Sequence, residues 1–177
     1  MTTDQQNQNS SSKGLHRAWK WAFELLFVIG IVAAIHFYQT ADMALGKAPD
    51  LGLEHSPTLF LQPKSDQKPV LVHFWATWCP ICKLEQGTIQ SLSEDYSIIT
   101  VASHSGVEDE IHQYMNEHSL SFPVIIDDMG SIARAWGVNG FPASFVLDHQ
   151  NMIRYRSMGY TTGWGLRIRM CLANQSQ

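Results

Sequence analysis

Apolar residues are spread unevenly along the chain, and their spacing predicts where the main elements lie. Residues 1–12 are rich in Gln, Asn, Ser and Thr and cannot bury enough apolar surface to fold. Residues 18–38 are strongly apolar, with an uninterrupted centre at 25–35, and about 20 residues of helix span a bilayer core. We therefore expect a disordered cytoplasmic tail over 1–17, a transmembrane anchor over 18–38, a tether over 39–47 and a folded domain over 48–177.

Two other interpretations of the apolar segment compete with an anchor, namely a cleaved secretory signal and a buried helix of a soluble domain. The apolar centre begins late and runs long for a compact signal, and no clear Ala-x-Ala site follows it. Lys13 and Arg17 precede the segment and Lys20 lies at its start, whereas Lys47 is the only basic residue in the next fifteen. Because cytoplasmic flanks are enriched in Lys and Arg, we expect one span with the N-terminus in the cytoplasm and the domain outside.

Within the domain, short β-branched runs alternate with segments of helical periodicity. Strands are predicted at 59–61, 70–75, 98–102, 122–127, 143–147 and 152–156, and helices at 83–95, 107–118, 131–136 and 163–173. The last two strands are separated by a turn at 148–151 that favours a hairpin. This order predicts an α/β domain with a mixed central sheet and helices on both faces.

Composition narrows the classes of function. The chain has 177 residues with 45% hydrophobic content, enough for one ordinary core and a short appendage. A net charge of −4, without basic stripes interleaved with aromatics, gives no reason to expect nucleic acid as a partner. Three cysteines are too few for a disulfide-built scaffold, so the two that share one motif point to chemistry.

That motif is Cys79-Pro80-Ile81-Cys82, where an apolar strand turns into a helix. The first N–H groups of a helix lack intrahelical partners and its dipole is positive there, so a thiolate at Cys79 is stabilised and able to attack disulfides. Pro80 suits a first turn because no N–H donor is needed. Half of a zinc site is the chief alternative, but Cys171 stands alone and no second Cys-x-x-Cys exists. We expect no metal ligand and no cofactor.

The segment 74–82 resembles the active-site segment of thioredoxin-fold proteins. Ala48-Pro49-Asp50, Glu85 and Gly140-Phe141-Pro142 extend the likeness to the membrane-tethered TlpA, ResA and DsbE group of extracytoplasmic thiol-disulfide oxidoreductases, from about residue 48 onward. Within this group the chain is most similar to the suppressor-of-copper-sensitivity D (ScsD) type. The resemblance implies a thioredoxin fold with a TlpA-type β–α insertion in the middle, preceded by one transmembrane helix.

The same resemblance implies a substrate-binding surface. The matching proline, Pro142, is cis and faces the disulfide in the resembled fold, and the backbone of Phe141 is then free to pair with a substrate segment. An exposed Trp78 beside the cysteines gives a partner an apolar docking surface, with Pro80 and Ile81 between the two cysteines. An ordinary loop proline and ordinary rim aromatics are the alternatives.

Glu85, His73 and Cys171 each have an expected role of their own. Glu85 lies one helical turn beyond Cys82, so its carboxylate could exchange a proton with that thiol; a solvated glutamate on the helix face is the alternative. His73 departs from the Asp or Asn that stands there in the resembled proteins, and a satisfied core or edge histidine is expected. Cys171 is expected to be a small buried hydrophobe.

Together these residues predict a tethered oxidoreductase at the outer face of a bacterial inner membrane, with its domain in the periplasm. Cys79 attacks a disulfide of an exported client protein, Cys82 resolves the mixed disulfide, and a membrane electron donor reduces the pair again; the oxidising direction runs the same steps backwards. The alternative from another class is a copper-handling protein that binds Cu(I) through Cys79, Cys82 and His73 or His104.

Overall fold

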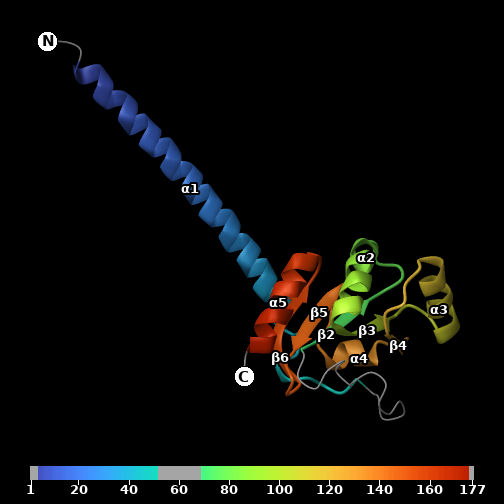
Figure 1. The fold of residues 1–177 in the computed structure, drawn as a ribbon. Coiled ribbons are helices and arrows are strands. Elements are labelled where there is room, and N and C mark those ends of the chain that lie inside the picture. The colour runs from blue at the N-terminus through green and yellow to red at the C-terminus, as the bar shows by residue number, and fades with distance from the viewer. Residues whose placement is uncertain (1–3, 52–68, 176–177) are drawn as a thin grey trace. The chain divides into compact units, whose positions relative to one another are not determined.

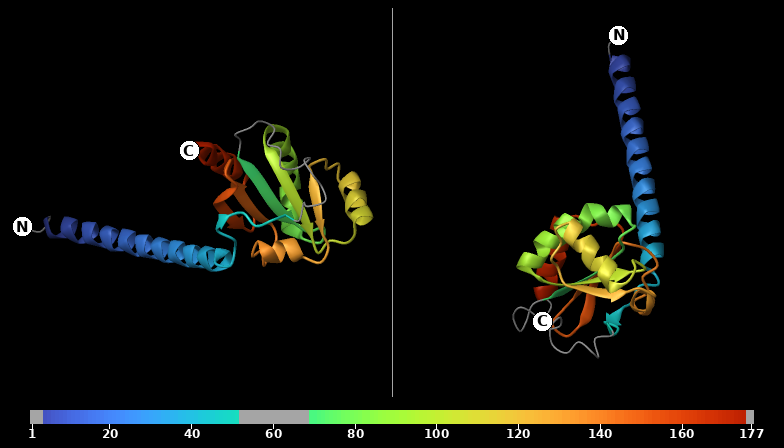
Figure 2. Two further views of the ribbon diagram at one scale, coloured as in Figure 1. Left: turned by 90° about the horizontal axis from the view of Figure 1, so that it is seen from below. Right: turned by 90° about the vertical axis from the view of Figure 1, so that its right-hand side faces the viewer.

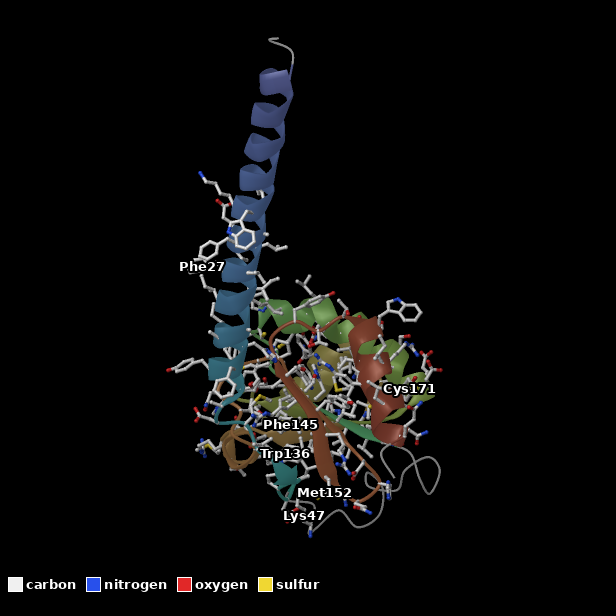
Figure 3. The ribbon with its side chains drawn as sticks, turned by 90° about the vertical axis from the view of Figure 1, so that its left-hand side faces the viewer. Phe27, Lys47, Trp136, Phe145, Met152 and Cys171 are labelled. Carbon is white, nitrogen blue, oxygen red and sulfur yellow. The ribbon has the colours of Figure 1, made fainter. Side chains whose placement is uncertain are left out.

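A single long helix, α1 (Asp4–Thr40), forms the first of two units, which meet between Ala41 and Asp42. The computed structural model describes the backbone of residues 4–51 and 69–175, with side chains from residue 19 onward in these ranges. The strand expected at 59–61 lies outside the described residues. Within α1, the 22 residues Trp19–Thr40 are long and apolar enough to cross a membrane, in the place predicted for the span. Their large apolar side chains, such as Phe27, stand out exposed (Figure 3).

Where a disordered tail was expected over 1–17, the described part of that segment is helical. From Asp4 onward its backbone is helical and continuous with the apolar part of α1. Nucleation is the costly step of helix formation, and each residue added to an existing helix gains a backbone hydrogen bond. A polar segment joined to a long apolar helix therefore extends that helix even though it has no apolar face of its own.

The second unit is built on one six-stranded sheet with the order β1-β6-β5-β2-β3-β4. Its strands are β1 (Gly46–Lys47), β2 (Val70–Trp75), β3 (Ser97–Ser103), β4 (Val124–Asp127), β5 (Ala143–Leu147) and β6 (Met152–Met158). Strands β2, β3 and β4 are parallel, whereas β5 is antiparallel to β2, and β6 to β5. The predicted mixed sheet is confirmed.

Helices cover both faces of this sheet. They are α2 (Pro80–Asp95), α3 (Glu108–Glu117), α4 (Ser131–Ala135) and α5 (Gly163–Gln175). Figures 1 and 2 show α2 and α5 over one face and α4 over the other. Strand β2 is buried along its whole length because Leu71 and Trp75 pack toward α2 and α5, while Phe74 packs on the opposite face. There Trp136 and Phe145 meet at a ring distance of 4.9 Å (Figure 3).

In the middle of the fold, where a β–α insertion is expected, α3 is followed by β4, which adds an edge strand beside β3. Tyr114 of α3 ties this segment to the rest. Its hydroxyl accepts a hydrogen bond from Gln86 Nε2 at 2.7 Å, and its ring lies 5.8 Å from that of Trp75. The insertion is therefore packed against α2 and the central strand.

The segment expected as a tether, 39–47, is largely part of the domain. Met43 is buried, and its carbonyl accepts a hydrogen bond from the Arg156 guanidinium. Lys47 of β1 pairs with Met152 of β6, and the two lie side by side at the sheet edge in Figure 3. Two residues of strand carry no periodicity, so this long-range pairing has no local sequence signal.

Candidate active site

The two cysteines lie where β2 ends and α2 begins. Cys79 is the N-cap residue of α2, and its Sγ accepts a hydrogen bond from the Cys82 backbone N at 3.2 Å. Pro80 fills the first helical position, which needs no N–H donor. Both cysteines are free thiols. The Cys79 sulfur therefore stands at the positive end of the helix, where an N-cap oxygen stands in other helices, and a thiolate is stabilised there.

A distant loop covers this sulfur. Phe74 pairs with Ala143 across β2 and β5, which brings the preceding Pro142 to the end of β2. The Phe141–Pro142 peptide bond is cis. The Cys79 thiol lies 3.6 Å from the Phe141 carbonyl oxygen, to which it donates. Only 4% of Cys79 is exposed, because this loop lies over it.

Apolar side chains surround the cysteines on the outer surface. Trp78 is 61% exposed and Ile81 42% exposed, and Pro80 is exposed between them. The Trp78 Nε1 donates to the His104 carbonyl oxygen at 2.8 Å, and its ring lies 5.9 Å from that of Phe141. The hydrogen bond fixes the exposed Trp78 side chain in place. The predicted substrate-binding residues thus lie together around the cysteine pair.

Trp78, Pro80 and Ile81 form an exposed rim around the cysteines. Cys82 lies deeper than these residues, with 1% of its surface exposed. Burial raises the pKa of its thiol far above the usual range, and the hydrogen bond with Cys79 and the charge of Glu85 raise it further. A backbone interaction with Ala76 opposes these effects only in part. Cys82 therefore holds its proton firmly in the reduced site, and any reaction of its sulfur has to remove that proton.

Glu85 is not the solvated helix-face residue of the alternative interpretation, because only 1% of it is exposed. Its Oε1 accepts a hydrogen bond from the Thr161 backbone N. Burial raises the pKa of the Glu85 carboxyl to about 7, although the Thr161 bond acts in the opposite direction. Near neutral pH this buried group is thus close to half ionised, one helical turn from Cys82.

His73 is a satisfied core histidine, as expected. It is 2% exposed, and its Nδ1 lies 3.0 Å from Ser144 Oγ on the neighbouring strand. Burial lowers the pKa of the imidazole to about 4, so the ring is neutral near pH 7. His73 therefore brings a hydrogen-bonding group, and no charge, to the face of the sheet beneath α2.

The sequence model of the AhpC/TSA family matches residues 46–156, which include both motif cysteines, Glu85 and Pro142. The chain belongs to the AhpC/TSA family. Over 117 residues it is 32% identical to a thioredoxin-like protein of Haemophilus influenzae, covering 66% of this chain and 70% of that protein. It is 28% identical over 160 residues to sporulation thiol-disulfide oxidoreductase A of Bacillus subtilis, covering 81% of this chain and 93% of that protein.

A solved structure agrees at the level of the fold. StoA from Bacillus subtilis superposes with a TM-score of 0.51 at 24% identity, over 58% of this chain and 81% of that one. The predicted thioredoxin-like fold is thereby confirmed, and the resemblance to thiol-disulfide oxidoreductases is confirmed through the named relatives. The finer likeness to the ScsD type stays a prediction.

Several residues of this site carry no signal in the sequence. Ser144 and Ser157 face each other across β5 and β6, and Thr161 follows in the next turn. None has a local signal, because only the sheet register and a long-range contact bring them toward His73 and Glu85. The expectation that Cys171 is buried was wrong, because this residue is exposed. The buried face of α5 runs through Leu166, Met170 and Ala173, and a residue next to Met170 turns about 100° away from that face.

The copper alternative requires a cluster of ligands. Within residues 19–51 and 69–175, no three His, Cys, Asp or Glu side chains are grouped so that they could hold a metal ion. His73 is bound to Ser144 inside the sheet, and His104 is exposed at the rim. Within these residues, the Cu(I) ligands of the copper alternative are therefore not brought together.

Proposed function

We propose that this chain is a thiol-disulfide oxidoreductase, tethered outside the cytoplasm by α1, that reduces disulfides of exported proteins. The observation that carries the proposal is the Cys79 sulfur at the N-cap of α2, 3.2 Å from the Cys82 amide and beside the Pro142 loop. The names of its relatives support the reaction class, since one is a thiol-disulfide oxidoreductase. Two free thiols in one helical turn are ready to become one disulfide.

The chemistry is a two-electron exchange between sulfurs. The Cys79 thiolate attacks one sulfur of the client disulfide, a Cys79–client S–S bond forms, and the other client sulfur leaves as a thiolate. Cys82, once deprotonated, attacks the Cys79 sulfur and releases the second client thiolate. The client gains two electrons, and the cysteine pair loses two as it forms the Cys79–Cys82 disulfide.

Glu85 supplies the proton acceptor that the second step needs. Cys82 is buried and its raised thiol pKa keeps it protonated, so its proton has to pass to a nearby base before the sulfur can attack. Glu85 is buried one turn away with a pKa of about 7, close to the value at which a general base is most effective at neutral pH. Glu85 releases the proton taken from Cys82 to solvent later in the cycle.

Client proteins and the membrane electron donor dock on the same exposed rim around the cysteines. Trp78, Pro80 and Ile81 offer an exposed apolar surface, and the Phe141 carbonyl, beside the reacting sulfur, can pair with an extended backbone. Pairing through backbone groups depends little on client sequence. After each turnover a membrane electron donor returns two electrons and two protons to the Cys79–Cys82 disulfide.

The compartment follows from the candidate span. Trp19–Thr40 could cross a bilayer once, and the basic residues before it favour a cytoplasmic N-terminus. The domain then lies on the periplasmic side of a bacterial inner membrane. Clients with disulfides are found there, since oxidising compartments are where disulfides persist.

The test exploits the different tasks of the two cysteines. Cys82→Ser leaves the attacking sulfur but removes the resolving one, so the full-length variant should accumulate mixed disulfides with exported proteins. Cys79→Ser should form none, and Cys171→Ser, the matched control, should behave as the unaltered chain. The readout is a non-reducing gel of membranes, with mass spectrometry of shifted bands. Equal absence of adducts from both motif variants would contradict the proposal.

A further inference from the structure

One short turn touches three parts of the site. It joins β6 to α5 and spans residues 159–162. Gly159 N donates to the Pro142 carbonyl oxygen at 2.8 Å, and Thr161 N donates to Glu85 Oε1. At its other end, Thr162 Oγ1 accepts from Gly165 N at 3.2 Å in the first turn of α5. The turn therefore links the loop over Cys79, the buried carboxylate and a supporting helix.

Glu85 depends on this turn for its orientation. In the part of the chain that the structure describes, the Thr161 N–H is the one hydrogen-bond donor to its carboxylate. A buried carboxylate with no donor would be costly in its charged form. The Thr161 amide opposes the effect of burial and thereby keeps Glu85 ionisable near neutral pH.

The Thr161 backbone is in turn held by its own side chain. Its Oγ1 lies 3.4 Å from Ser157 Oγ and 3.5 Å from the Gly159 carbonyl oxygen. Ser157 also accepts a hydrogen bond from Arg169 Nη1 at 3.0 Å. These contacts hold the Thr161 side chain within the turn that carries its N–H.

Among the residues that the structure describes, no other charge accounts for the state of Glu85. Cys82 is the titratable neighbour on its own helix. On the elements packed against α2, His73 of β2 is kept neutral by burial, Arg169 of α5 binds Ser157, and Arg167 of α5 binds Asp95 at 2.7 Å. Burial and the Thr161 bond are the causes that act on the carboxyl, so removing the bond leaves burial unopposed.

We propose that Thr161 is a positioning residue, whose backbone N–H aims Glu85 for proton transfer with Cys82 and keeps it able to ionise in the working pH range. The inference rests on the proposed function and adds to it the group that controls the base. Because Gly159 of the same turn binds the Pro142 loop, the geometry of the proton acceptor is tied to the loop against which clients dock.

The first test needs no alteration of the turn. In the reduced, ¹⁵N-labelled full-length chain in detergent micelles, the Thr161 amide proton signal is followed across pH. It should shift with a midpoint near that of Glu85, about 7, and stay flat in Glu85→Gln. A Thr161 signal that is flat in the unaltered chain, or that titrates unchanged in Glu85→Gln, would overturn the proposal.

The second test compares two changes at the same position. Thr161→Pro removes the N–H, whereas Thr161→Val keeps the N–H and removes the hydroxyl. In Thr161→Pro the midpoint of the Glu85 carboxyl ¹³C signal should rise by roughly one to two pH units, the usual effect of a hydrogen bond to a charged group. Thr161→Val should change it by much less. Equal midpoints in a folded Thr161→Pro variant and the unaltered chain would refute the role of the amide, and if Thr161→Pro does not fold, the amide titration decides.

These readouts separate the inference from the proposed function, because neither involves a client. If the Thr161 amide titrates with Glu85 but the chain traps no client and reduces no insulin, the oxidoreductase proposal fails and the Thr161–Glu85 bond stands. If the chain reduces insulin and the amide does not titrate, only the positioning role is lost. If both hold, Thr161→Pro should also move the pH midpoint of the Cys82 step upward, and Thr161→Val should not.

Discussion

Cys82 and Glu85 form a donor and an acceptor whose proton affinities are both set by burial. Burial raises the pKa of Cys82 far above that of a free thiol, and it raises the pKa of Glu85 to about 7. A carboxylate of ordinary pKa is a weak base, so the raised pKa of Glu85 makes it a better acceptor for a thiol proton. Placed together in the core, the carboxylate becomes a stronger base where a tightly held proton has to be removed.

The role of Glu85 as a base can be tested in the second step of the exchange, in which Cys82 attacks the mixed disulfide at Cys79. Glu85→Gln keeps the shape of the side chain but cannot take the proton, so attack by Cys82 on a mixed disulfide at Cys79 should slow by about 100-fold. The rate should also lose its inflection near pH 7. Stopped-flow release of a chromogenic thiol measures this step. Glu94→Gln, on the exposed surface of the same helix, is the control, and an unchanged rate and pH profile in Glu85→Gln would leave Glu85 without a role in proton transfer.

His73 and Glu85 also act on stability, with opposite signs. For His73 the pKa falls from 6.5 to about 4, so between these values the unfolded chain binds a proton that the folded chain excludes, and stability rises with pH. For Glu85 the pKa rises from 4.5 to about 7, so the folded chain keeps a proton that the unfolded chain has lost, and stability falls with pH. Where these ranges overlap, the two contributions cancel.

Single substitutions should therefore expose opposite slopes. In Glu85→Gln the free energy of unfolding should rise between pH 4 and 6.5, and in His73→Asn it should fall between pH 4.5 and 7. Each slope should be about 1.4 kcal/mol per pH unit at most. Urea unfolding followed by tryptophan fluorescence measures both, and Asn preserves a partner for Ser144. Curves that run parallel to that of the unaltered chain would show that neither group is perturbed as described.

At the scale of elements, the sequence predicts what depends on neighbours along the chain. The pattern of β2 and the cysteine spacing at the start of α2 are local, and both stand where predicted. The role of Glu85 depends on Thr161, and such a contact between distant residues arises from sheet register and loop packing. Cys171 shows the other limit, because a short helix with apolar residues on several sides does not reveal which side faces the core.

The β5–β6 hairpin shows how one turn residue can organise an element. Asp148 is almost fully buried. Its Oδ1 accepts hydrogen bonds from Gln150 N at 2.8 Å and from Met152 N at 2.9 Å. Its Oδ2 accepts a hydrogen bond from Arg154 Nε at 2.6 Å. Burial alone would raise the pKa of this carboxyl, but these hydrogen bonds and the Arg154 charge together hold it below its usual value. The ionised form is therefore the one that the hairpin stabilises.

Removing Asp148 should weaken the hairpin and the domain. Asp148→Ala leaves two amides and a guanidinium without their acceptor, which should lower the free energy of unfolding by about 2–4 kcal/mol. Asp148→Asn keeps an acceptor for the amides and should lose less. Since the folded pKa lies below the unfolded one, the advantage of Asp over Asn is present at neutral pH and should shrink as the pH falls below 3.8. Urea midpoints at neutral and acid pH measure this; equal stability of all three chains would contradict it.

At the scale of the whole molecule, the function depends on which side of a membrane the domain occupies. Helix α1 carries an apolar segment whose side chains are exposed, and a bilayer would remove that surface from water. The basic residues Lys13 and Arg17 lie before that segment, and Lys20 lies at its start. A domain left in the cytoplasm would meet few stable disulfides, so the proposed activity and the proposed orientation stand or fall together.

The exposed Cys171 provides a direct probe of that orientation. In the double variant Cys79→Ser/Cys82→Ser, Cys171 is the single remaining cysteine, and its position on the surface of α5 makes it accessible without unfolding. A membrane-impermeant maleimide should therefore label it in intact spheroplasts as fully as after lysis. Labelling only after lysis would place the domain in the cytoplasm and remove its proposed clients.

A matched variant tests the cause of the orientation. Replacing Lys13, Arg17 and Lys20 with Gln, and adding lysines at Gln39 and Ala41, reverses the charge difference across the span without touching the domain. Because the more basic flank tends to remain in the cytoplasm, labelling of Cys171 in spheroplasts should drop sharply while labelling after lysis stays the same. If the reversed chain is labelled from outside as before, the flanking charges do not set its topology, and another feature of the chain has to direct its export.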